Sequence, residues 1–135
     1  MAQPNLRDFN KGQHMKYIEV NNKNIDVLFK LNRDLAIAEE QEDLFIVGKE
    51  AYKSGFLNEN PVVHGVLIYK NNIVIGFAIY LYKFATYLGK KILHIEDVYL
   101  EEKHKNTANI TNLLEYFIEL IFNLKYSVYK VNTLN

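Results

Sequence analysis

Three neighbouring segments rich in branched and aromatic residues constrain the fold of this chain most. They are residues 62–69, 73–84 and 91–100, and only short polar links separate them. The Lys-Asn-Asn link at 70–72 is typical of a tight hairpin, and Thr-Tyr-Leu-Gly-Lys at 86–90 is typical of a turn. Strands joined this closely pair as antiparallel neighbours. The sequence therefore predicts a three-stranded antiparallel meander at the centre of the protein.

Further predicted elements flank this meander on both sides in the sequence. Residues 15–20 read as a short strand, and apolar residues recur at helical spacing over 25–35. A second helix is predicted at 43–54, ended by Gly55. The strongest helical period covers 113–124, with Asn112 and Glu115 as its capping pair, and a last strand follows at 126–131. This order predicts an α/β (α+β) fold with a mixed, mostly antiparallel sheet flanked by helices.

Composition limits the classes of protein to which the chain can belong. The 135 residues carry 16 basic and 16 acidic side chains, so no global field favours nucleic acid or an anionic membrane as partner. No apolar run is long enough to span a bilayer, and no cysteine is present. The four dispersed histidines predict no metal site. We expect a cytoplasmic protein with a flexible leader at 1–14 and one domain at 15–135.

Three short motifs occur in the order and spacing of one enzyme family. Residues 35–39 read Leu-Ala-Ile-Ala-Glu, residues 74–80 read Val-Ile-Gly-Phe-Ala-Ile-Tyr, and residues 95–100 read Ile-Glu-Asp-Val-Tyr-Leu after Gly-Lys at 89–90. They resemble Leu-Ala-x-Tyr-Glu, Ile-x-Gly-Phe-Ala-x-Tyr and Leu-Glu-Asp-Leu-Tyr-Val of the GNAT-type N-acetyltransferases, in the spermidine/spermine and thialysine branch. The similarity spans about residue 15 to the C-terminus.

The resemblance implies a site for acetyl-CoA between two splayed parallel strands, 91–100 and 126–131. The pantetheine arm would pair with the backbone around Val98 and Leu100, and the pyrophosphate would lie at the start of the long helix. An amine substrate would approach from the other side of the sheet.

The same resemblance implies roles for four carboxylates. Glu96 matches the glutamate thought to take a proton, through water, from the attacking ammonium, and is the catalytic candidate. Glu39, Glu40 and Asp97 are candidates for the lining that binds a small amine or polyamine. The alternatives are a relic or structural carboxylate at Glu96 and a solvated surface for the others. Ala38 stands where the branch has tyrosine, which weakens the polyamine assignment.

The pyrophosphate loop departs from the family pattern. In the branch this loop has the sequence Arg-Gly-x-Gly-Ile-Gly. When the chain is aligned with it without gaps, Lys105 stands at the arginine, and Asn106, Ala108 and Ile110 stand at the glycines. Glycine lets a phosphate approach backbone N–H groups at a helix start, whereas a branched isoleucine is poorly suited to positive φ. These four residues, together with Val98 and Leu100, are the cofactor-binding candidates. The alternative is a polar loop and helix start that no longer binds phosphate.

The end of the chain also departs from the pattern. The family continues into a helix bearing a tyrosine proposed as general acid, and then into a hairpin, whereas this sequence ends at Asn135. We therefore expect the fold to lack the last helix and hairpin. An uncovered last strand exposes a sheet edge that other chains can pair with. The sequence predicts self-association through Val128, Tyr129 and Val131.

These observations favour a GNAT-fold, polyamine- or diamine-type N-acetyltransferase-like protein that is impaired or inactive. It would use acetyl-CoA if active and no cofactor otherwise. Two alternatives stay open. One is a working amine acetyltransferase that a partner chain completes, and the other is a non-catalytic protein-interaction module.

Overall fold

A computed structural model describes residues 15–122 and the backbone of residues 128–133. Its central sheet has five strands in the order β1-β2-β3-β4-β5. The bounds are β1 Lys16–Glu19, β2 His64–Lys70, β3 Ile73–Ala85, β4 Lys90–Leu100 and β5 Val128–Thr133. The first four strands are antiparallel, whereas β5 pairs with β4 in parallel. The predicted meander and the mixed sheet are confirmed.

The two hairpins of the meander close through residues with left-handed backbone angles. Asn71 and Asn72, the two residues between β2 and β3, have φ values of 52° and 64°. Two consecutive positive φ values define the type I′ turn that suits the twist of a two-residue hairpin. In the β3–β4 turn, Gly89 has a φ of 64° and its N–H donates to the Ala85 carbonyl. The sequence thus fixes the pairing of all three central strands.

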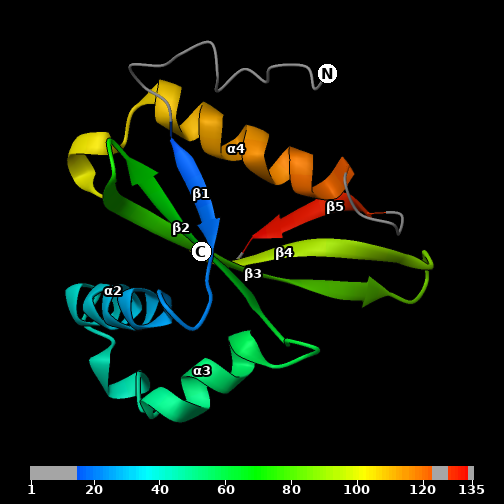
Figure 1. The fold of residues 1–135 in the computed structure, drawn as a ribbon. Coiled ribbons are helices and arrows are strands. Elements are labelled where there is room, and N and C mark those ends of the chain that lie inside the picture. The colour runs from blue at the N-terminus through cyan, green and yellow to red at the C-terminus, as the bar shows by residue number, and fades with distance from the viewer. Residues whose placement is uncertain (1–14, 123–127, 134–135) are drawn as a thin grey trace.

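Helices cover both faces of the sheet (Figure 1). One face packs against α4, Thr107–Phe122, and its core includes Met15, Leu93 and Leu113. The other face packs against α2, Ile25–Ala38, and α3, Lys49–Leu57, around Phe77 and Leu28. Both cores are built by alternate residues of the same strands, as the period of two in a strand requires.

The second predicted helix differs from the observed one. Residues 43–54 do not form one helix: a 3-10 turn, η2, covers Glu42–Leu44, and α3 begins only at Lys49 after Gly48 in extended conformation. Gly55 lies inside α3 and does not end it. The helix ends before Asn58, whose side-chain N–H donates to the Ser54 carbonyl. A side chain that satisfies a free carbonyl of the last turn ends this helix without glycine.

The last predicted helix starts earlier than its apolar period indicates. Asn112, predicted as a cap, is a buried residue in the middle of α4, and its Oδ1 accepts a 2.6 Å hydrogen bond from the Tyr17 hydroxyl. The capping residue is Asn106, as described below. Residues 126 and 127 of the predicted last strand lie outside the described residues, as do the side chains of Val128, Tyr129 and Val131 and the leader 1–14.

Candidate functional site

A β-bulge in β4 arranges the acidic residues of the third motif. Ile79 pairs with Asp97 and Tyr80 pairs with Ile95, so Glu96 is an extra residue opposite β3. Ile95 belongs to the core under α4, whereas Ile79, the partner of Asp97, belongs to the core under α2 and α3. The bulge therefore shifts by one residue the alternation of β4 side chains between the two faces of the sheet. As a result, Glu96 and Asp97 can reach the same side.

An acidic cavity of about 310 Å³ lies where β4 meets the end of α2 and the η2 turn. Three carboxylates line it: Glu39 follows the last residue of α2, and Glu96 and Asp97 come from the bulge. Its other walls are polar and apolar side chains of α2 and the following turn, namely Asn32, Leu35, Ala36, Gln41, Leu44 and Phe45. Negative charge thus faces a space wide enough for a small organic cation.

The charges of this cavity act on one another. Burial raises the pKa of Asp97 above its usual value, and the nearby carboxylates Glu96 and Glu39 raise it further. Burial also raises the pKa of Tyr52 to about 12, although the side chain of Asn32, which lines the cavity, donates a 2.9 Å hydrogen bond to its hydroxyl. A positive charge bound here would relieve the repulsion among the carboxylates.

His94 is an additional polar residue next to the predicted base. Its side chain is buried, and Nε2 lies 3.4 Å from Oε1 of Glu96. Within the described part of the chain, Nδ1 has no hydrogen-bond partner. The sequence analysis did not predict this contact between His94 and Glu96. The two-residue spacing on one strand was the signal that could have revealed it.

The structure places the predicted amine-site residues in two groups. Glu39, Glu96 and Asp97 share the acidic cavity, although 57 residues separate Glu39 from Glu96 in sequence. Glu40 is not among the residues that line it. Its backbone has a φ of 57°, a left-handed value just after the end of α2.

The predicted pantetheine strand presents a backbone edge. In the described structure β5 pairs with β4 only between Lys91 and Ile95, beside the first half of β4 (Figure 1). From Asp97 to Leu100, β4 pairs with β3 alone among the described strands. The side chain of Val98 is half-exposed and that of Leu100 is buried. This edge fits the extended backbone pairing that a pantetheine arm requires.

The start of α4 fits a pyrophosphate poorly. Oδ1 of Asn106 accepts a 2.8 Å hydrogen bond from the backbone N–H of Asn109, and the N–H of Ile110 donates to the Asn106 carbonyl. Asn106 is therefore the N-cap of the helix. Ala108 and Ile110 are helical, and neither has a positive φ. Lys105 lies 3.5 Å from the Glu102 carboxylate. The Asn106 side chain thus occupies a backbone donor that a phosphate would need.

The described residues also bear on metal and membrane binding. They hold no group of three or more His, Cys, Asp or Glu side chains arranged to bind a metal ion. None of the helices in the described part of the chain has the length and apolar character needed to cross a membrane.

Known proteins match this chain in structure but not in sequence. No protein-family model and no curated protein sequence matches the chain. Solved structures do match it. A possible acetyltransferase from Clostridium difficile 630 superposes with a TM-score of 0.69 at 16% identity, over 90% of this chain and 79% of that one. The chain has a GNAT-like acetyltransferase fold.

Two further solved structures have the same fold. The ribosomal-protein-alanine N-acetyltransferase from Brucella melitensis biovar Abortus 2308 gives a TM-score of 0.65 at 12% identity, covering 90% of this chain and 81% of that chain. The aminoglycoside N-acetyltransferase AAC(6')-Iy, solved in complex with CoA, gives 0.64 at 10% identity, covering 90% and 77%. At these identities the likeness concerns the GNAT-like fold alone.

Proposed function

We propose that this GNAT-like protein binds a cationic amine of the polyamine or diamine type in its acidic cavity, and that its use of acetyl-CoA is impaired. The observation that carries the proposal is the meeting of Glu39, Glu96 and Asp97 in one cavity. The impairment follows from the start of α4, where Asn106 caps the helix that would receive the pyrophosphate.

The chemistry of the cavity suits an amine with an alkyl chain. Ammonium groups pair with carboxylates, and a charge held close to several carboxylates is bound more strongly than at an open surface. Leu35, Leu44 and Phe45 offer apolar contact for methylene groups beside those carboxylates. A polyamine or diamine combines both features, whereas an anionic substrate would meet repulsion from all three acids.

Glu96 is the proposed proton acceptor of this site. An ammonium has no lone pair, so it must lose a proton before its nitrogen can act as a nucleophile. The Glu96 carboxylate lines the cavity and is about half-exposed, which leaves room for a bridging water. In an impaired protein the same carboxylate still contributes to binding of the cation.

Calorimetric titration with spermidine and, separately, with acetyl-CoA tests the proposal. We expect spermidine to bind the wild-type protein and to bind Glu39→Gln or Glu96→Gln about tenfold more weakly, the effect of one charge-assisted contact. Glu59→Gln, an exposed loop substitution outside the cavity, is the matched control. We expect acetyl-CoA to bind the wild type only weakly, without clear thermal stabilisation.

The two parts of the proposal fail separately. Equal spermidine affinity for the wild type and both cavity variants would contradict the amine site. Clear stabilisation by acetyl-CoA would contradict the impairment and favour the second candidate, a working amine acetyltransferase completed by a partner chain. The backbone edge of β4 from Glu96 to Leu100 is the observation that favours this candidate.

A further inference from the structure

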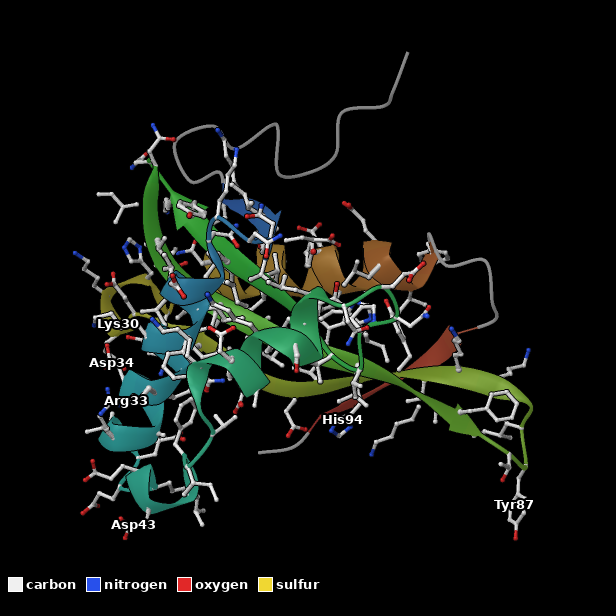
Figure 2. The ribbon with its side chains drawn as sticks, turned by 60° about the horizontal axis from the view of Figure 1, so that its bottom comes forward. Lys30, Arg33, Asp34, Asp43, Tyr87 and His94 are labelled. Carbon is white, nitrogen blue, oxygen red and sulfur yellow. The ribbon has the colours of Figure 1, made fainter. Side chains whose placement is uncertain are left out.

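The β3–β4 hairpin ends in an exposed tip, residues 83–91, that is both apolar and basic. The hairpin extends beyond the helices (Figure 1), and Tyr87 lies at its far end, away from the rest of the protein (Figure 2). Tyr87 is fully exposed, and Phe84 is 64% exposed. The tip contains three lysines and no acidic residue. Large apolar side chains grouped on a projecting arm mark an interaction surface.

An acidic segment, residues 39–46, has the opposite character. It carries four acidic side chains and no basic one. Leu44 is 77% exposed and Ile46 is 87% exposed, so large apolar groups lie beside the charges here as well. Figure 2 places Asp43 of this segment and Tyr87 of the hairpin tip at opposite ends of the molecule. The two surfaces therefore cannot meet within one chain.

We propose that the hairpin tip of one copy of this chain docks on the acidic segment of a second copy. The surfaces are complementary in charge, and both offer exposed apolar side chains for burial. Each copy carries one tip and one segment, so a dimer with two-fold symmetry would make the contact twice and leave neither surface open. The contact regions are small, and the resulting dimer is a weak, reversible one.

Docking at this place also affects the acidic cavity. Glu39, Gln41, Leu44 and Phe45 belong to the acidic segment and line the cavity. A tip bound to this segment would therefore contact residues that also line the cavity. The proposal itself depends on neither acetyl-CoA nor amine binding, and its test is independent of both.

Charge reversal on each surface gives the decisive experiment. One variant reverses the tip with Lys83→Glu, Thr86→Glu and Lys90→Glu, and the other reverses the acidic segment with Glu40→Lys, Glu42→Lys and Asp43→Lys. We expect the wild type to self-associate in sedimentation velocity, more strongly at low salt because ions screen exposed charges. Each variant alone should be monomeric, since its tip and segment carry the same sign.

A mixture of the two variants should restore the dimer, because each tip then meets a segment of opposite charge. A wild type that stays monomeric over the whole concentration range would overturn the proposal. So would a dimer that both variants retain, which would place the interface elsewhere, for example at β5.

Disulfide trapping gives a second measurement that does not depend on charge. The chain has no cysteine, so any disulfide must join introduced residues. We expect Tyr87→Cys mixed with Ile46→Cys to give a cross-linked heterodimer under mild oxidation. Tyr87→Cys mixed with Ile73→Cys, an exposed position at the β2–β3 turn, is the control. Equal cross-linking of both mixtures, or of neither, would overturn the proposal.

Discussion

Replacing Asn106 with glycine tests whether the helix cap prevents cofactor binding. Removing the 2.8 Å bond from the Asn109 N–H to the Asn106 side chain costs only a few tenths of a kcal/mol when glycine is the replacement. At about 4 °C per kcal/mol for a domain of this size, the melting temperature should fall by about 1–2 °C. The variant should therefore fold normally with a donor free at the start of α4.

The affinity gain follows from the strength of one freed donor. A hydrogen bond to a charged group contributes about 1.5–3 kcal/mol, and each 1.4 kcal/mol is tenfold in affinity. We expect Asn106→Gly to bind CoA about 10- to 100-fold more tightly than the wild type. Pantetheine, which lacks the pyrophosphate, should show no such gain. Calorimetry with both ligands separates the phosphate contribution from any other effect.

Asn58→Gly is the matched control, because Asn58 also accepts a backbone hydrogen bond, from Asn60 at 2.7 Å, but lies at the end of α3. Glycine at Ala108 or Ile110 would be less informative. Both residues are helical, and glycine there costs roughly 1 kcal/mol each. A stable Asn106→Gly protein with unchanged CoA affinity, or with an equal gain for pantetheine, would refute the reasoning.

Two further predictions concern the fold and the cavity. Because the pKa of Asp97 is raised above 3.8, its ionised form is disfavoured in the folded state, so this group lowers stability as pH rises above that value. Asp97→Asn should remove this loss of stability. Denaturant titrations at several pH values should therefore show the variant gaining stability over the wild type as pH rises. A difference in unfolding free energy that stays constant with pH would contradict this. Gly76→Ala should destabilise the protein by more than about 3 kcal/mol, because an added Cβ would lie 2.0 Å from the Tyr99 carbonyl oxygen in β4. Gly48→Ala, with open space around its Cβ, should change the unfolding midpoint little, and a similar loss in both variants would argue against the close approach of β3 and β4.

The central strands could be predicted because local signals decide them. Alternating branched residues mark each strand, and Asn71, Asn72 and Gly89 supply the positive φ values of the turns. The observed bounds differ from the predicted ones by at most two residues. One of the motifs contains Gly76, but only the structure shows why glycine is needed there. The neighbouring strand β4 lies too close to leave room for a Cβ.

The start of α4 could not be predicted because polar residues occupy buried positions there. Asn109 and Asn112 are both buried on α4, so the apolar period became visible only at Leu113. Partners remote in the sequence satisfy them: Lys70 lies 3.5 Å from Asn109, and Tyr17, 95 residues away, donates to Asn112. Such hydrogen bonds leave no local sequence pattern, since a buried amide is tolerated only where the fold supplies its partner.

The candidate site was predictable in its residues and not in its geometry. The motif resemblance selected Glu39, Glu96 and Asp97, but their meeting in one cavity depends on the end of α2 lying against β4. The contact between His94 and Glu96 depends on the local course of β4 around the bulge. A bulge adds one residue to a strand, and the sequence here contains no glycine or proline to mark it.

The two halves of the site differ in what maintains them. The acidic cavity is formed by side chains on elements that the core needs in any case, so it persists as long as α2 packs against β4. A phosphate site at a helix start instead needs backbone donors left unoccupied, which is less stable in the absence of ligand. Asn106 satisfies one of those donors from within the chain. Stability of α4 and affinity for a pyrophosphate therefore compete at this residue, and selection for the fold alone favours the cap.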